Sequence, residues 1–496
     1  MFYPSKSEYI KIAQNYNLIP VYKEYIVDTE TPASIFIKAG GLKREGFLLE
    51  SIEGQKNLSR YSFIGVGCNN LVKFDREVFS LNDGSKKVFE TKTTNPLLEL
   101  EKIMKGYRLY KNPQLDHFVG GAVGYLSYDL VRYFEQIPVR KNKLFIPEIM
   151  LYLTDLMVAF DHLFNRIKII STMKIESKIP AGKAYDISVE KIENLEKKIK
   201  QNNGNNFRSS LDSAAIDNTT VGPNLNSNFG KEEFIEGVKR VKKYITEGEA
   251  FQVVLSQQFY TDEFSDSFSI YRGLRTINPS PYMYYFNFGE FKIIGASPEP
   301  LIKINGRKIL TCPIAGTRRR GRTSGEDRAL INDLLNDRKE KAEHNMLVDL
   351  ARNDLGRVCQ YGSVKVKKYM SVEKYSHVIH LVSRVEGTLD KNNSIYNALK
   401  SVFPAGTLSG APKIRAMQII SELEPDSRGP YGGSVGYFGY DGNLDSCITI
   451  RTAIVKNGVA YIQAGAGIVY DSEPEHLDSG SYAPLLEERE VIKLFK

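Results

Sequence analysis

The sequence predicts an α/β (α+β) protein with a large, antiparallel-rich β core, sandwich-like and made of two related halves, with helices packed outside. Three observations support this fold class. Up to about residue 175, short β-branched and aromatic runs alternate with polar turns. Beyond about residue 230, strand-like and helix-like patterns alternate. A ten-residue glycine-rich segment occurs once in each half of the chain.

The first elements of the chain are predicted to be strands. Residues 62–66 and 71–74 are short apolar runs bounded by polar turns, which is typical of half-buried strands. After them, residues 187–201 carry apolar side chains at helical spacing among lysines and glutamates, so we expect a surface helix. Residues 202–228 are rich in Asn, Ser, Gly and Thr, which indicates a solvated linker.

This pattern predicts a division into two domains and a connection. The expected parts are an N-terminal domain (1–175), a surface helix with its linker (176–229) and a second domain (230–496). The second domain is expected to carry helices at 231–247, 325–355 and 413–423, and strands at 251–255, 282–288, 291–295, 446–455 and 459–464.

An internal repeat links the two halves. Residues 120–129 and 432–441 are identical at seven of ten aligned positions. Because the repeat occurs only once per half, it does not indicate a solenoid. We expect both halves to place a similar glycine-rich strand in one architecture; chance similarity between Gly/Tyr-rich strands is the alternative.

Composition excludes several classes of protein. The 496 residues, 42% hydrophobic and 25% charged, are typical of a globular chain. No apolar run reaches the roughly 18–20 residues of a membrane span, and the first residues lack the plan of a signal peptide, so we expect a cytoplasmic protein. The net charge is +8. Its one compact basic run, residues 318–322, has no accompanying nucleic-acid motif and favours anion steering or a solvated loop.

Two carboxylates are candidates for metal binding. Glu340 and Glu343 are three residues apart in a predicted helix and therefore share a face. Carboxylate oxygens without neighbouring histidines suit a hard cation such as Mg²⁺. The alternative is an ordinary solvated helix in which these carboxylates pair with nearby lysines.

Two glycine-containing segments are candidates for anion binding. Residues 313–317 and 463–467 each follow an apolar strand and are expected to be loops that expose backbone N–H groups. Arg318 and Arg451 would add charged donors that suit a carboxylate. Ordinary tight turns are the alternative. Together the features favour a small polyanionic substrate.

Two further side chains are ambiguous on pattern alone. His380 alternates with apolar neighbours, so it is either a core histidine or a site residue. Glu299 follows a strand, so it is either an ordinary turn carboxylate or a positioned acid.

At these motifs the chain resembles the large subunits of anthranilate synthase, within the chorismate-utilising enzyme family. The resemblance covers about residues 230–476 and extends to residues 48–51 and 120–129 in the N-terminal part. It rests on residues 313–317, 339–354, 380–384, 406–416, 431–438, 450–453 and 463–467, in the order expected for the family.

The resemblance implies an activity and a set of roles. Chorismate would be aminated on its ring, and pyruvate would be eliminated to leave anthranilate, the first step of tryptophan biosynthesis. Glu343 would bind magnesium with Glu340 beside it, Glu299 would protonate the departing hydroxyl, and His380 would assist elimination. The residues implied in holding chorismate are Gly316, Thr317, Tyr431, Arg451, Gly465, Ala466 and Gly467, with Thr317 also counted among the catalytic residues.

Two positions distinguish this chain from its relatives. Isochorismate-forming enzymes carry a lysine base where this chain has Gln252, and an amide cannot act as a base. Enzymes of the 4-aminobenzoate route typically carry a lysine where this chain has Ala315. Free ammonia is therefore the expected nucleophile, although an aminodeoxychorismate synthase component I remains an alternative.

The resemblance also implies partners and an inhibitor. The chain shows no glutamine-hydrolysing cysteine site, so a glutamine amidotransferase subunit (component II) is expected, in a heterotetramer of two copies of each subunit. Ser51, Pro281, Tyr282 and Met283 match the family's site for L-tryptophan, the feedback inhibitor; core packing is the alternative.

The C-terminal tail departs from the family. The second magnesium ligand is expected at residue 480, where this chain has Gly480, and Leu477 replaces an earlier acidic residue. A frame-shifted terminus and true divergence both remain open. The change predicts reduced activity, and a weakly active or inactive tryptophan-binding subunit is a further alternative.

Overall fold

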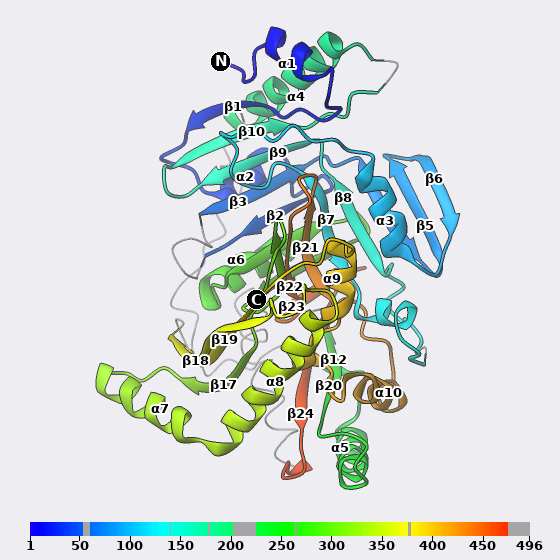
Figure 1. The fold of residues 1–496 in the computed structure, drawn as a ribbon, viewed down its shortest axis with the longest axis vertical. Coiled ribbons are helices and arrows are strands. Elements are labelled where there is room, and N and C mark those ends of the chain that lie inside the picture. The colour runs from blue at the N-terminus through cyan, green and yellow to red at the C-terminus, as the bar shows by residue number, and fades with distance from the viewer. Residues whose placement is uncertain are drawn as a thin grey trace.

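The computed structural model describes residues 1–52, 60–138, 140–176, 179–201, 225–262, 264, 266–374 and 378–474. Within these residues the chain forms two antiparallel sheets of 12 strands each, with helices outside them (Figure 1). This confirms the predicted antiparallel-rich β core. Most of the expected linker (202–228) and the divergent tail (475–496) lie outside the described residues.

The first sheet combines strands from both halves of the chain. Its order is β1 (Val21–Ile26), β10 (Arg166–Ser171), β9 (Leu156–Asp161), β3 (Tyr61–Val66), β2 (Gly46–Glu50), β13 (Tyr282–Asn287), β14 (Phe291–Ser297), β23 (Thr452–Lys456), β24 (Val459–Ile468), β12 (Gln252–Thr261) and β11 (Asn226–Ser227), with β20 (Gly410–Ala411) paired to β12.

The second sheet also combines strands from both halves of the chain. Its order is β17 (Ile314–Arg319), β19 (Val378–Thr388), β16 (Lys308–Thr311), β15 (Pro300–Asn305), β22 (Leu444–Ile448), β21 (Ser434–Gly439), β7 (Gly121–Leu126), β8 (Ile149–Leu153), β4 (Asn70–Asp75), β5 (Val78–Asp83) and β6 (Lys86–Lys92), with β18 (Lys365–Lys374) paired to β19. Residues 1–175 and 230–496 thus share both sheets, and their division into folding domains stays a prediction.

The helices cover the outer faces of the two sheets. They are α1 (Lys6–Ile12), α2 (Pro32–Lys38), α3 (Pro96–Lys105), α4 (Ala181–Gln201), α5 (Lys231–Thr246), α6 (Ser267–Ile277), α7 (Ser324–Asn336), α8 (Arg338–Gly356), α9 (Ile395–Val402) and α10 (Lys413–Leu423), with 3₁₀ turns η1 (Tyr128–Tyr133) and η3 (Gly406–Leu408). The predicted helices at 187–201, 231–247 and 413–423 are confirmed as α4, α5 and α10.

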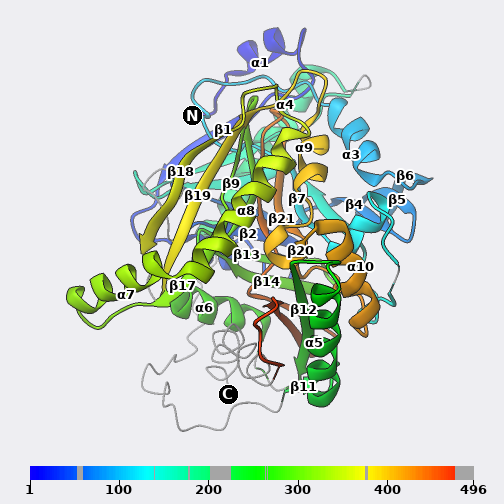
Figure 2. The same ribbon diagram turned by 60° about the horizontal axis from the view of Figure 1, so that its bottom comes forward.

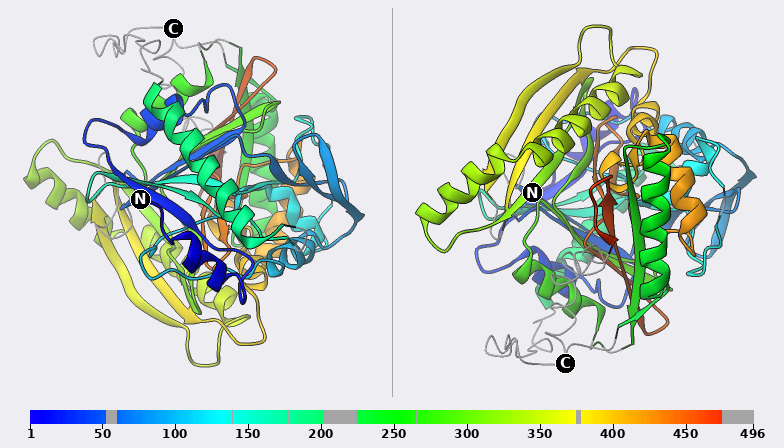
Figure 3. Two further views of the ribbon diagram at one scale, coloured as in Figure 1. Left: turned by 90° about the horizontal axis from the view of Figure 1, so that it is seen from above. Right: turned by 90° about the horizontal axis from the view of Figure 1, so that it is seen from below.

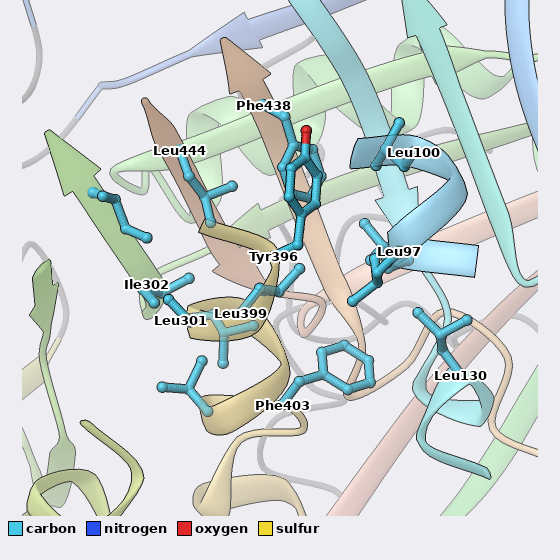
Figure 4. Close-up of a cluster of buried hydrophobic side chains, with 14 of the residues drawn as sticks. Leu97, Leu100, Leu130, Leu301, Ile302, Tyr396, Leu399, Phe403, Phe438 and Leu444 are labelled. Atoms are coloured by element: carbon cyan, nitrogen blue, oxygen red, sulfur yellow. The ribbon is translucent and has the colours of Figure 1, made fainter. Parts of the chain in front are cut away.

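The three largest apolar clusters of the described residues follow from this layering. The inner cluster joins β13 side chains such as Tyr284 to β7 side chains such as Tyr125, so the two sheets face each other. A second cluster lies between the first sheet and helices α1, α2, α4 and α6. A third lies between the second sheet and α3, α8, α9 and α10. There, Tyr396 of α9 stacks on Phe438 of β21, with ring centroids 5.3 Å apart (Figure 4).

The repeated glycine segments form neighbouring strands. β7 and β21 pair antiparallel, and Gly124 lies directly opposite Gly436. A Cβ on Gly124 would come within 2.0 Å of the Met150 carbonyl oxygen of the next strand. The repeat therefore marks the centre of the second sheet, where the strand backbones leave no room for a side chain.

Two predicted elements are interrupted. The expected helix 325–355 breaks at Asp337, whose carboxylate accepts hydrogen bonds from the N–H groups of Lys339 and Glu340 and so begins α8. The expected strand 446–455 breaks between β22 and β23, where Arg451 has a φ of +51° and redirects the chain from the second sheet to the first.

None of the helices in the described ranges is long and apolar enough to cross a membrane.

Candidate active site

The predicted catalytic and chorismate-binding residues gather where one end of each sheet meets α8. β24 and β12 come from the first sheet, and β17 and β19 come from the second. α8 packs on β17 and β19, as Figure 2 shows. On the other side, α5 packs on β12 and β24 (Figure 3). The segment 403–412, which contains η3, contacts both α8 and β24.

Glu299 is a buried acid between β14 and β15. The Thr407 hydroxyl lies 3.3 Å from Oε1 and 3.5 Å from Oε2, and the Ile448 N–H donates to the Glu299 carbonyl. Burial raises the pKa of Glu299 to about 8, and the Thr407 hydrogen bond and the Arg451 charge oppose this rise. The carboxyl group is therefore largely protonated at neutral pH and can act as a general acid.

His380 lies on β19 opposite Thr317 of β17. Its Nδ1 is 3.1 Å from the Thr317 hydroxyl and 3.3 Å from the Gly316 carbonyl oxygen. Burial, with the nearby Arg451 charge, lowers the pKa of His380 to about 4, so the ring is neutral at pH 7. Because a carbonyl only accepts, Nδ1 carries the proton, and Nε2 is the nitrogen that can take one up.

Arg451 connects these two groups electrostatically. Its positive charge lowers the pKa values of both Glu299 and His380, which places the three side chains in one neighbourhood. Its guanidinium Nη1 also donates to Asn278 Oδ1 at 3.0 Å. The strained backbone at Arg451 thus aims a cation toward a buried acid and a neutral base.

The two carboxylates of α8 do share one face. Glu343 accepts a hydrogen bond from Gln252 Nε2 at 2.9 Å, and Glu340 accepts one from Arg318 at 3.2 Å. Burial raises the pKa of Glu340, the Arg318 hydrogen bond opposes this, and the Glu343 charge raises it further. Mutual repulsion between half-buried carboxylates is the environment that a divalent cation relieves, so the donor set fits Mg²⁺.

These carboxylates do not form a complete protein cage. Among the described residues, no group of three or more His, Cys, Asp or Glu side chains is placed to hold a metal ion. Magnesium usually keeps several waters and takes only one or two carboxylates from a protein, so two carboxylates suffice for a site completed by substrate. The position of the expected second ligand, residue 480, lies outside the described residues.

Arg318 does not supply the expected charge for a substrate carboxylate. Its guanidinium makes ion pairs with Asp333, Asp337 and Glu340, at 2.6, 2.8 and 3.2 Å. The pattern could not reveal this, because the three acids come from α7, from its junction with α8 and from α8, and meet only when the two helices are folded against β17. Arg318 instead fixes the start of α8 and orients Glu340.

Both predicted glycine loops are strands, and this corrects the sequence interpretation. Residues 314–319 form β17, which bulges at Gly316, where φ is +71°. Residues 463–467 belong to β24 and pair with β12. The physical reason is tertiary pairing, which a glycine-rich pattern does not reveal. Among the described strands, β23 pairs with β24 from Val459 as far as Ile462 and no further. After Ile462, one edge of β24 therefore has no strand partner and faces the site.

The glycines on that edge make room for neighbouring side chains. A Cβ on Gly465 would lie 3.0 Å from the Tyr431 hydroxyl oxygen, and one on Gly467 would lie 2.7 Å from Gln252 Nε2. Gly465 and Gly467 face the same side of the strand, with Ala466 between them. Tyr431, Gln252 and Glu343 are therefore brought together along β24.

The expected tryptophan residues form a separate neighbourhood. Met283 pairs with Glu50, so Ser51 continues the chain beside Tyr282, next to Pro281. Tyr282 donates to Asp445 Oδ1 at 2.8 Å, whereas the Met283 side chain lies in the outer cluster under α6. The buried Ser51 hydroxyl has no hydrogen-bond partner among the described residues.

Sequence reasoning missed two features of the site. Thr407 lies in a segment that the sequence analysis singled out, but its contact with Glu299 spans 108 residues. A fully buried ion pair joins Arg428 to Glu424, with Nη2 2.6 Å from Oε1. Arg428 lies over the Tyr431 ring, 5.6 Å from its centroid. Glu424 precedes Arg428 by four residues, so the ion pair had a local signal, although its complete burial did not.

This arrangement defines an enzyme site for a small anionic substrate, with a protonated acid, a neutral base and a cation in one neighbourhood. The chain belongs to the family of chorismate-binding enzymes, whose family model matches residues 47–476.

The chain is similar over nearly its whole length to proteins named anthranilate synthase component 1. The protein of Acetivibrio thermocellus is 46% identical over 487 residues, covering 96% of this chain and 95% of the relative. That of Aquifex aeolicus is 45% identical, covering 95% and 94%. The crystal structure of anthranilate synthase component I from Streptococcus pneumoniae matches with a TM-score of 0.75 and 33% identity, covering 94% and 99%. These matches confirm the predicted family.

Proposed function

We propose that this chain is the chorismate-converting subunit of an anthranilate synthase, which forms anthranilate and pyruvate from chorismate and ammonia. The observation that carries the proposal is the buried Glu299 carboxyl, whose pKa of about 8 keeps its proton at physiological pH. Loss of the ring hydroxyl requires such an acid. Similarity to component 1 proteins along the whole chain supports the same reaction.

The residues of the site have distinct tasks in this reaction. Arg451 and the open edge of β24 at Gly465 bind the substrate carboxylates. Glu299 gives its proton to the departing hydroxyl, and Thr407 holds the carboxyl group in place. Nε2 of neutral His380 takes the proton released as pyruvate is eliminated. Such proton transfers each contribute about 10²–10⁴-fold.

Magnesium is part of the proposal. Glu343 is the principal protein ligand, and Glu340 lies one helical turn before it. The bound cation would neutralise a substrate carboxylate and act as a template. Gln252 Nε2 holds Glu343 from the other side, so the carboxylate is oriented before the cation binds.

We also propose a partner and an inhibitor. The name component 1, borne by the relatives, implies a second component, here a glutamine amidotransferase that delivers ammonia. L-Tryptophan is proposed to bind at Ser51 and Tyr282, where a buried hydroxyl lacks a partner in the described part of the chain. The Asn278–Arg451 hydrogen bond lies between that neighbourhood and the active site.

A fluorescence assay tests the activity. The purified chain is mixed with chorismate, ammonium and magnesium, and anthranilate fluorescence is followed with and without L-tryptophan. We expect a rising signal that tryptophan suppresses. Consumption of chorismate without fluorescence would instead indicate an aminodeoxychorismate synthase. Tryptophan binding without consumption would indicate an inactive subunit.

A further inference from the structure

A cavity of about 50 Å³ borders the buried acid Glu299 outside the substrate site. Among the described residues that line it, only Glu299 and Thr407 belong to the active site, and none of those implied in holding chorismate takes part. The rest of its wall comes from α8, β15, the segment 311–313 and the segment 402–406. The cavity therefore reaches the general acid by a route that the substrate does not occupy.

This cavity has the size and the polar groups to hold water. One water molecule needs roughly 10–15 Å³ of such space, so about three fit. The Glu299 carboxyl group, the Thr407 hydroxyl and the Asp354 carboxylate offer hydrogen bonds to them. Apolar side chains form much of the remaining wall, among them Leu301, Leu347, Leu350 and Val402. Waters held there would therefore bond mainly to one another and to these three groups.

An ion pair lies where the cavity meets solvent. Lys413 Nζ donates to Asp354 Oδ2 at 2.7 Å and to the carbonyl oxygen of Val402 at 3.3 Å, and both acceptors belong to wall residues. The Lys413 and Asp354 side chains keep 13% and 12% of their surface exposed. Burial raises the pKa of Asp354, and the Lys413 charge opposes this rise. Asp354 is thus a carboxylate in contact with both solvent and the cavity.

The reaction creates a need for such a connection. Each turnover leaves Glu299 without its proton, because that proton departs with the ring hydroxyl as water. We propose that the cavity waters form the path by which a proton returns from solvent, through Asp354, to Glu299. Asp354 takes one proton from solvent and passes it to the adjacent water, each water passes one on, and the last forms the O–H bond of Glu299. The inference rests on the proposed function, which supplies the acid that must be recharged.

Stopped-flow anthranilate fluorescence, with ammonium as the nitrogen source, tests the path. Ala351→Met places a longer side chain in the cavity from α8 and displaces water. Enzyme resting at pH 7 already carries the Glu299 proton, so its first turnover should run at the wild-type rate. Later turnovers need the returned proton, so we expect a burst of one product per site and then a kcat at least about tenfold lower. Ala342→Met, at an exposed alanine of the same helix, is the matched control.

A second variant removes the proton carrier instead of the water. Asp354→Asn cannot take up and release a proton, so it should show the same burst and the same slow later turnovers. The KM for chorismate should stay within about twofold in both variants, because neither position touches the substrate residues. This variant decides the test if Ala351→Met does not fold.

The outcomes separate this inference from the proposed function. A wild-type chain that forms no anthranilate overturns both. An active wild type whose folded variant keeps its kcat overturns the proton path alone, because Glu299 then regains its proton from the substrate side. Equal losses in the first and later turnovers also overturn it, because they indicate a displaced Glu299. A burst that is absent in Ala342→Met supports the path.

Discussion

Replacing Glu299 with glutamine should stabilise the protein while it disables the reaction. Raising the pKa of a carboxyl group from 4.5 to about 8 means that folding disfavours its ionised form by about 5 kcal/mol. The folded state therefore holds the proton where the unfolded state has released it. Stability is full below pH 4.5 and falls as the pH rises toward about 8.

Glutamine has the same shape and no charge to bury, so Glu299→Gln escapes this loss. At pH 5 the expected gain in the free energy of unfolding is about 1 kcal/mol, and at pH 7 it is about 3 kcal/mol. A chain of this length has an unfolding entropy of roughly 1 kcal/mol per degree, so the difference in Tm should grow by about 2–3 °C between pH 5 and pH 7. Scanning calorimetry of both proteins across this range measures it.

The same substitution should lower kcat by about 10²–10⁴-fold, because the general acid is lost. In the wild type, kcat should fall as the pH rises through about 8. Thr407→Val removes the hydrogen bond that favours the ionised form, so the fall should move to higher pH, whereas Thr407→Ser should leave it in place. A Tm difference that does not change with pH, together with a flat rate profile up to pH 9, would refute the reasoning.

Three further predictions concern the cation, the core and the inhibitor. Glu343→Gln should raise the magnesium concentration for half-maximal activity at least about tenfold. Asp349→Asn, which changes an exposed carboxylate of the same helix, should leave that concentration unchanged. A magnesium titration in which the two variants behave alike contradicts the assignment of Glu343 as a ligand. Arg428→Met should lower the free energy of unfolding by about 3–5 kcal/mol, because the Glu424 carboxylate stays buried without its partner. The double variant Arg428→Met, Glu424→Gln should regain part of the lost stability, as measured by thermal unfolding. If it regains none, the unpaired charge is not the cause of the loss. Ser51→Phe should abolish tryptophan inhibition and leave kcat within about twofold, which inhibition curves check; retained inhibition would place the inhibitor elsewhere.

Periodic elements could be predicted closely from the sequence. The helices α5 and α10 begin and end within a residue of their expected limits, because each carries a continuous apolar face. The break between α7 and α8 was also accessible in principle. Asp337 is a favoured residue at a helix start, and Glu340 follows it at the third position of the new helix.

Features that depend on distant contacts could not be predicted. The extent of β24 depends on pairing with β12, some 200 residues away. The role of Arg318 depends on acids from two helices. The proton on Glu299 depends on burial by segments that include Thr407, 108 residues distant. Local spacing identified these residues as chemically interesting, but the states of their side chains are properties of the assembled fold.

The site lies where regular strand pairing fails, and this gives a physical reason for its place. β17 bulges at Gly316, β22 and β23 are separated at Arg451, and β24 runs on past its last partner in β23. Backbone groups inside a ladder are committed to each other, whereas those at a bulge, a break or an unpaired edge remain available to a ligand. The three irregularities converge on the residues assigned to chorismate. The glycines and the left-handed arginine are thus the local cost of an opening between two otherwise closed sheets.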